Sequence, residues 1–218
     1  MNIMSPQHLA ILALSLAAST ALAAPAKPAT RLLPTEYEAR IQQATADPET
    51  LAAGKRAASY LCIWCHGEDG NSVLESIPNL AGQNPVYLLT QIQKFGDGHR
   101  NSEFMSGLIK AIKDEDRVSM SVYYAAMRPN TPAATNAALI EKGRKRYLAT
   151  CVGCHGGKAY GNKRIARLAG QRVSYLTHAL ANYRASNGTR RDPMMTPVAR
   201  RLTPEDIAAV SAYLSTLK

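Results

Sequence analysis

Two five-residue segments, Cys62–His66 and Cys151–His155, share the pattern C-x-x-C-H and contain all four cysteines of the chain. On a helix, residues three and four positions apart lie on one face, so each segment places two thiols beside one imidazole. This pattern is the signature of c-type haem attachment, in which two thioether bonds hold the macrocycle and the histidine ligates its iron. The sequence therefore predicts two covalently bound haem c groups. The residues predicted to bind them are Cys62, Cys65, His66, Cys151, Cys154 and His155.

Other chemistries also use pairs of cysteines, and each explains less of the pattern. Zinc ribbons usually separate their two pairs by a dozen or two residues, whereas 85 residues lie between Cys65 and Cys151. A thioredoxin-like motif needs a strand–helix–strand context, which the sequence lacks. Two structural disulfides would leave both histidines unexplained.

A repeat relates the two halves of the chain. The two motifs lie 89 residues apart, and Leu80–Gln83 recurs as Leu168–Gln171 at a spacing of 88. Patterns typical of strands are nearly absent, and apolar residues recur at helical spacing. Because two copies of a unit cannot form a solenoid, we predict an all-α fold of two tandem domains, each wrapped around one covalent haem.

Local signals place several helix ends. A helix is expected over Glu36–Ala46, and Thr50 is expected to cap the helix that leads into the first motif. Further helices are expected near Pro85–Phe95 and over Asp114–Met127, with a break at Gly96–Gly98.

A haem held by one histidine has a second axial position, and its occupant separates an electron carrier from an enzyme. Met105 lies 39 residues after His66, and the repeat register carries it onto Met195, 40 residues after His155. Met105 and Met195 are therefore the predicted sixth ligands. The alternatives are a methionine that only fills a gap in the core, and Met194 as the ligand of the second haem.

Other residues that can reach a haem are given different roles. His99 and His178 are the alternative sixth ligands, but neither is repeated in the other half. Met120 and Met127 fall inside helical patterns and are expected in the core. Trp64, inside the first motif, is expected to pack near the first haem.

A ligating histidine usually donates its other N–H to a carbonyl or carboxylate, which fixes its orientation. The carbonyl of Pro78 is the predicted partner of His66, and the carbonyl of Ala166 that of His155. Haem propionates need cationic or polar donors. Side chains that recur in register are the candidates, unless they are only surface charges and turn residues: Arg100, Arg190, Gln83 and Gln171.

The N-terminus has the features of an export signal. Residues 1–23 contain no Lys, Arg, Asp or Glu, an apolar run over Leu9–Ala18 and a small-x-small site at Ala21–Ala23. These features predict a cleaved secretory signal and a periplasmic protein, with an uncleaved membrane anchor as the alternative. The predicted divisions are a signal peptide at 1–23, an N-terminal extension at 24–48, one domain at 49–128, a linker at 129–135 and a second domain at 136–218.

The formal net charge is +10. A basic balance favours acidic docking surfaces or peripheral association with anionic membrane lipid. Nucleic acid is not an expected partner, because the basic residues are spread along the chain and an exported protein rarely meets nucleic acid.

The combined motifs resemble the dihaem cytochrome c4 family over nearly the whole mature chain, from about Gly54 to the C-terminus. The segments that carry the resemblance are Cys62–Gly67, Gly70–Ser72, Leu80–Gln83, Tyr87-Leu88, Met105–Gly107, Cys151–Gly156, Leu168–Gln171, Tyr175, Met195 and Leu202–Asp206. Departures from the family pattern are Ala166 in place of the usual proline, the extension at 24–48 and the strongly basic charge.

The resemblance implies two class I cytochrome c domains that pack with their haem propionate edges facing each other, and His/Met ligation of both irons. It also implies periplasmic transfer of single electrons between respiratory partners, not enzymatic catalysis. The implied acceptor is a haem–copper terminal oxidase, and the donor a quinol-oxidising complex or a small redox protein.

Two alternative functions remain. One is a haem enzyme, such as a dihaem peroxidase or a thiosulfate-oxidising cytochrome, which needs an open iron or a cysteine ligand. The other is a cytochrome subunit fixed to a dehydrogenase or oxidase, with residues 24–48 as a docking arm.

Overall fold

The described part of the chain is helical. The computed structural model describes residues 34–45, 47–131, 136–185 and 189–218, which belong to one compact unit. The predicted signal peptide at 1–23 lies outside these residues, as do parts of the predicted extension and linker. The predicted domain boundaries therefore stay predictions.

Eleven helices are described, and the only extended pairing among the described residues is an isolated bridge between Arg100 and Arg190. The all-α prediction is confirmed. In the first half the helices are α1 (Pro34–Thr45), α2 (Pro48–Leu61), α3 (Ile63–His66), α4 (Pro85–Gly96), α5 (Glu103–Lys110) and α6 (Asp114–Ala126). In the second half they are α7 (Ala137–Thr150), α8 (Val152–His155), α9 (Val173–Arg184), α10 (Met195–Arg200) and α11 (Pro204–Ser215).

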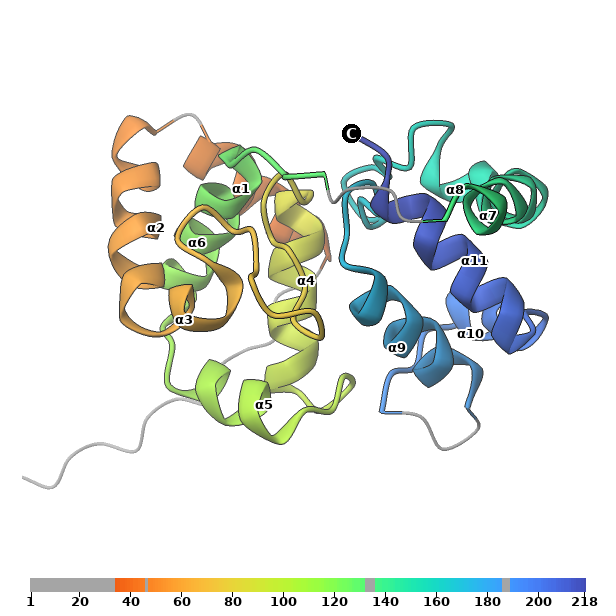
Figure 1. The fold of residues 1–218 in the computed structure, drawn as a ribbon. Helices are drawn as coiled ribbons and strands as arrows, with labels where there is room; N and C mark the ends of the chain where they lie inside the picture. The colour runs from red at the N-terminus through yellow and green to blue at the C-terminus, as the bar shows by residue number, and fades with distance from the viewer. Residues whose placement is uncertain (1–33, 46, 132–135, 186–188) are drawn as a thin grey trace, which may run out of the picture. The chain divides into compact units, whose positions relative to one another are not determined.

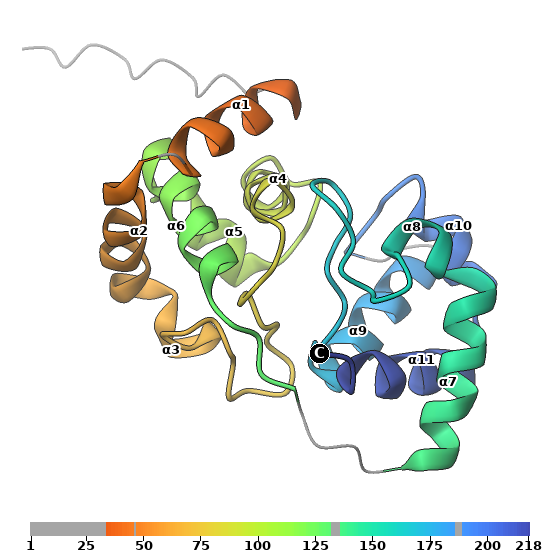
Figure 2. The ribbon, with the colours of Figure 1, turned by 90° about the horizontal axis from the view of Figure 1, so that it is seen from above.

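The two halves repeat one arrangement. In the first half α2 packs on α6, and in the second α7 packs on α11 (Figures 1 and 2). Each pair crosses at a glycine that recurs in the sequence. A Cβ added to Gly54 would lie 2.2 Å from the Ser119 carbonyl oxygen, and one added to Gly143 would lie 1.9 Å from the Ala209 carbonyl oxygen. The repeat therefore preserves a close contact between helix backbones.

Helix α2 begins earlier than its sequence suggests. Asp47 is the N-cap, because its carboxylate accepts from the Glu49 N–H at 3.0 Å. Pro48 occupies the first turn, where its missing N–H costs nothing. Thr50, the expected cap, lies inside the helix and donates its hydroxyl to Asp47. The cap assignment to Thr50 is wrong, because Asp47 reaches the free N–H groups first.

The helical part of the predicted extension is integrated into the first half. Helix α1 packs on α4 and α6, and its Tyr37 and Ile41 are buried with Val86, Leu89 and Val122. The sequence predicted this helix but not its packing. Among the described residues, no helix is long and apolar enough to cross a membrane.

We expect Gly54→Ala and Gly143→Ala to destabilise the holoprotein by about 3 kcal/mol each, because the new methyl group meets backbone atoms that cannot move away without separating the helices. Guanidinium chloride unfolding, followed by circular dichroism, measures this loss. Gly107→Ala is the control: it lies in α5 with no atom within 4 Å of the added Cβ, so its helix propensity gives no loss. Equal stability of all three variants would contradict the close crossing.

Candidate haem site

Both motifs open onto one cavity of about 800 Å³, which is lined by residues of both halves. All eight predicted cofactor-binding residues line it: Cys62, Cys65, His66, Met105, Cys151, Cys154, His155 and Met195. The structure thus brings each C-x-x-C-H segment to the same cavity as the methionine predicted for its half. Much of the remaining lining is apolar, which suits a macrocycle with polar edges.

Each motif forms a single helical turn. Helix α3 follows Cys62, and α8 follows Cys151, so both cysteines and the histidine of each motif share one turn. Gly67 ends the first turn with a φ of +81°, and an added Cβ there would lie 2.5 Å from the Asn71 carbonyl oxygen. A residue without a side chain is needed there, because the chain must reverse sharply after the ligand.

The two histidines are buried and held by backbone carbonyls. His66 Nδ1 lies 2.9 Å from the Pro78 oxygen, and His155 Nδ1 lies 3.0 Å from the Ala166 oxygen. These contacts confirm both predicted hydrogen bonds. A carbonyl can only accept, so Nδ1 carries the proton and Nε2 keeps its lone pair. Burial lowers the pKa of both imidazoles and favours this neutral form, which is the form that ligates iron.

The four thiols suit covalent attachment. None forms a disulfide. Burial raises the pKa of Cys62 and of Cys151 to about 11, so both are protonated. Among the described residues, no three His, Cys, Asp or Glu side chains gather as a metal site requires. The four-thiolate zinc alternative thus lacks the clustering it needs, whereas thiol pairs beside an imidazole on an apolar wall fit haem c.

The two predicted methionine ligands lie in the first turns of short helices. Ser102 caps α5 by accepting from the Met105 N–H at 3.4 Å. Asp192 accepts from the N–H groups of Met194 and Met195, at 3.0 and 3.1 Å. Met194 also lines the cavity, but its side chain is 69% exposed, whereas Met195 is partly buried.

Among the other histidine, methionine and tryptophan candidates, Met120 also lines the cavity, whereas the rest do not. His99 and His178 are exposed and are not among the cavity-lining residues. Met120 is buried in the core, as predicted, and Met127 packs against the same cluster. The expectation for Trp64 is wrong: its side chain is 77% exposed and does not line the cavity.

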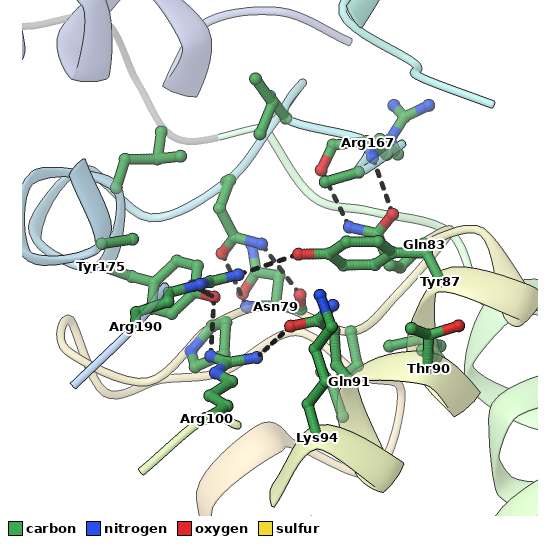
Figure 3. A pocket seen from close by; sticks show the side chains of 18 of the residues that line it. Asn79, Gln83, Tyr87, Thr90, Gln91, Lys94, Arg100, Arg167, Tyr175 and Arg190 are labelled. Carbon is green, nitrogen blue, oxygen red and sulfur yellow. Dashed lines mark hydrogen bonds between the residues drawn. The ribbon is translucent and has the colours of Figure 1, made fainter. Parts of the chain in front are cut away.

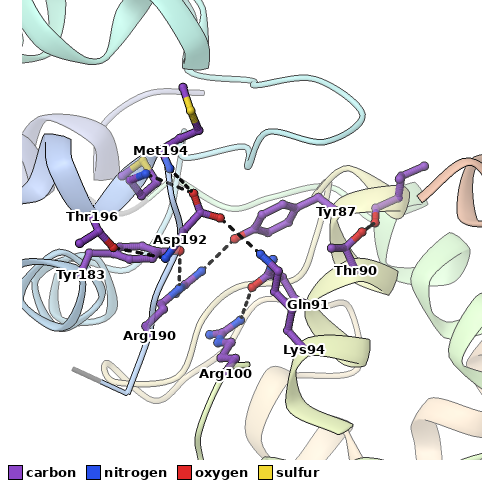
Figure 4. Close-up of polar contacts among 12 residues, drawn as sticks. Tyr87, Thr90, Gln91, Lys94, Arg100, Tyr183, Arg190, Asp192, Met194 and Thr196 are labelled. Carbon is purple, nitrogen blue, oxygen red and sulfur yellow. Dashed lines mark hydrogen bonds and ion pairs between the residues drawn. The ribbon is translucent and has the colours of Figure 1, made fainter. Parts of the chain in front are cut away.

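Two arginines that recur in register meet where the halves join. Arg190 is buried and donates to the phenol oxygens of Tyr175, Tyr183 and Tyr87 at 2.8, 2.6 and 2.9 Å. Arg100 donates to the same Tyr175 oxygen at 3.1 Å (Figure 3). Figure 4 shows Arg190 with Tyr183 and Tyr87. We call these five side chains the arginine–tyrosine cluster.

The arginine–tyrosine cluster concentrates positive charge. Burial raises the pKa of Tyr175, but the cations of Arg190 and Arg100 outweigh burial and lower the pKa to about 7. Both arginines line the cavity, so they can meet anionic haem propionates there. The sequence predicted the two arginines but not that tyrosine hydroxyls accept their hydrogen bonds. The recurrence of Tyr87 as Tyr175 could have indicated this role.

The halves are also joined by other polar contacts. Lys94 forms an ion pair with Asp192 at 3.3 Å (Figure 4). Gln83 and Gln171, the two other propionate candidates, each use one side-chain N–H to bind a backbone carbonyl of the opposite half.

Comparison with known proteins supports a haem site. A protein-family model of cytochrome c matches residues 140–218. The chain is 34% identical to cytochrome c4 of Thiocapsa roseopersicina over 183 residues, covering 78% of this chain and 93% of that one. It is 32% identical to a thiosulfate dehydrogenase electron acceptor of Thiomonas intermedia over 179 residues, covering 75% and 81%. Its structure is similar to that of reduced cytochrome c4 from Pseudomonas stutzeri, with a TM-score of 0.71 and 31% identity, covering 77% and 98%.

We expect Tyr175→Phe to destabilise the holoprotein by about 1–3 kcal/mol, because it leaves donors of the buried Arg190 and the half-buried Arg100 without their shared acceptor. Tyr87→Phe removes the acceptor of one arginine and should cost less. Tyr60, which is 78% exposed, provides the control, since Tyr60→Phe should change nothing. Thermal unfolding of the three variants gives the order, and a Tyr175→Phe variant as stable as the control would contradict the role of the shared phenol.

Proposed function

The chain belongs to the cytochrome c4 family of dihaem electron-transfer proteins, and on that premise we propose that it shuttles single electrons between respiratory partners in the periplasm. The observation that carries this proposal is the cavity onto which each half places one C-x-x-C-H turn and one downstream methionine. Two covalently bound haem c groups are the cofactors of this family.

We assign the cysteine pairs to thioether attachment and one histidine and one methionine of each half to the iron. Haem 1 takes Cys62, Cys65, His66 and Met105, and haem 2 takes Cys151, Cys154, His155 and Met195. A bound haem c supplies a reversible one-electron change at its iron.

The chain's own residues tune this chemistry. The backbone carbonyls of Pro78 and Ala166 hold the two imidazoles in one orientation. With Met105 and Met195 as the second ligands, a bound haem would favour the reduced iron. One histidine and one methionine in each half would leave a bound iron no site for an exogenous ligand, and electron transfer requires no nucleophile or proton donor from the protein. These properties favour a carrier over a peroxidase or a thiosulfate-oxidising enzyme.

The partners are proposed from charge and from the family. A haem–copper terminal oxidase is the proposed acceptor, and a quinol-oxidising complex or small redox protein the proposed donor. The net charge of +10 supports docking on acidic surfaces and peripheral contact with anionic lipid. The apolar run and small-residue site within residues 1–23 support export to the periplasm.

A second candidate donor is a thiosulfate dehydrogenase. It is favoured by the similarity to the electron acceptor of that name from Thiomonas intermedia. Mixing the oxidised chain with thiosulfate and a catalytic amount of thiosulfate dehydrogenase, and separately with a quinol-oxidising complex, compares the two donors through the rate of haem reduction. Size-exclusion chromatography of the native protein from membranes separates a free shuttle from a fixed subunit.

We expect Met105→Leu to abolish the methionine-to-ferric-iron charge-transfer band of haem 1, and Met195→Leu that of haem 2. Each substitution should also let carbon monoxide bind the reduced iron of that haem. Leucine keeps the volume and removes the sulfur. Met194→Leu is the matched control and should keep both bands. Optical titration of each variant measures these changes, and loss of the haem 2 band in Met194→Leu alone would transfer the ligand role to Met194.

We expect electron transfer to a solubilised haem–copper oxidase to slow roughly tenfold as salt rises from low to well above physiological ionic strength, because salt screens attraction to an acidic surface. Stopped-flow mixing measures the rate. An uncharged chemical reductant provides the control, since its rate should stay flat. A flat rate with the oxidase as well would count against charge-guided docking.

A further inference from the structure

The carbonyl that holds the first histidine belongs to a peptide group that also contacts the second half. The Pro78 oxygen accepts from His66 Nδ1 at 2.9 Å. The N–H of the same peptide group, that of Asn79, donates to the Gln171 side-chain oxygen at 2.8 Å. One planar peptide therefore joins the histidine of the first half to a glutamine of the second.

The reverse arrangement occurs at the second histidine. The Ala166 oxygen lies 3.0 Å from His155 Nδ1, and the N–H of that peptide, that of Arg167, donates to the Gln83 side-chain oxygen at 2.7 Å (Figure 3). We call the two glutamines with their peptide partners the crossed-glutamine contacts.

Both glutamine side chains are fixed in position. Gln83 donates from Nε2 to the Arg167 carbonyl at 2.8 Å, and Gln171 donates to the Asn79 carbonyl at 2.9 Å. Each glutamine oxygen also accepts the N–H of the next residue in its own chain segment, at 3.0 Å in both cases. Both glutamines are 6% exposed, so water competes little for the peptide N–H groups.

Hydrogen bonds in series polarise one another in a low-dielectric interior. A peptide whose N–H is bound has a more negative carbonyl oxygen, which accepts more strongly from the imidazole N–H. A more strongly bound N–H makes the imidazole a better electron donor to a metal. Each crossed-glutamine contact thus favours the oxidised state of the iron that its histidine ligates.

We propose that Gln83 is a positioning residue for His155, and Gln171 for His66, so that each half sets the reduction potential of the haem held by the other half. The inference rests on the proposed ligation by the two histidines. Its distinguishing feature is the crossing: a substitution in one half should act on the iron of the opposite half.

We expect Gln83→Leu to increase the equilibrium constant for reduction of haem 2 about twofold. This corresponds to a potential about 18 mV higher for one electron. Gln171→Leu should raise that of haem 1 by a similar amount. Potentiometric titration, followed through the hyperfine-shifted haem methyl resonances of each ferric haem, reads the two potentials separately.

A matched control weakens the same interface and leaves the crossed-glutamine contacts in place. Asn84 donates from its side chain to the Tyr160 and Ile165 carbonyls of the second half at 3.1 and 2.8 Å, but it does not bind the Ala166–Arg167 peptide N–H. Asn84→Ala should leave both potentials in place. Three results would overturn the proposal. They are a changed potential of the haem in the substituted half, no change in either potential, and an equal change in the Asn84→Ala control.

Proton resonances give a second readout that general loosening does not predict. In the fully reduced, diamagnetic protein, Gln83→Leu should move the His155 Nδ1–H signal upfield and leave that of His66 in place. Gln83→Glu keeps the acceptor oxygen and should place the His155 signal at or downfield of its wild-type position. Equal upfield shifts in both variants would contradict the role of the acceptor.

The design separates the inference from its premise. Ligated histidines show ring protons shifted far upfield by the porphyrin in the wild-type reduced protein, and their absence would overturn the ligation itself rather than the crossing. If Gln83→Leu does not fold, Gln83→Asn can replace it, because its side chain is one methylene shorter and its amide no longer reaches the Arg167 N–H. The potential of haem 2 should again rise.

Discussion

The hydrogen bond from a buried imidazole N–H to a backbone carbonyl is the interaction on which both sites depend. It selects the tautomer, turns the free nitrogen toward the cavity and ties the motif turn to the loop about twelve residues downstream. Burial supports it by keeping His66 and His155 neutral. The second site needs no proline for this bond, since Ala166 presents its carbonyl at nearly the same distance as Pro78.

The contact between the halves is strongly polar, and its central amides and guanidinium groups bind across it. Gln83 and Gln171 bind backbone groups of the opposite half, and Arg100 and Arg190 share one phenol. Buried amides and guanidinium groups are costly unless every donor finds an acceptor, so such contacts tolerate few relative positions of the halves. Each of the two glutamines that hold the halves together binds the same peptide group that binds a histidine of an attachment motif.

Much of the fold followed from local patterns. The helices that became α1, α4 and α6 were predicted near their observed ends, and the repeat located the second half. Helix α5 was missed, because it has only eight residues and one of them is Gly107, a poor helix former. The cap of α2 was assigned to Thr50, but proline is favoured in the first turn of a helix, so Pro48 places the start of α2 at Asp47. Trp64 was expected at the haem, but its side chain lies on the solvent face of the turn.

The sequence by itself determined the local chemistry. The attachment motifs and the carbonyl beside each histidine depend on spacing along one chain segment, which a helical turn and a short loop convert directly into geometry. Only the tertiary structure decided that Gln83 accepts from the Arg167 N–H and that the Tyr175 hydroxyl accepts from two arginines. Those partners are 84 residues apart in the first case and 75 in the Arg100 pair. Contacts over such separations depend on how the two halves pack, and no local periodicity encodes that packing.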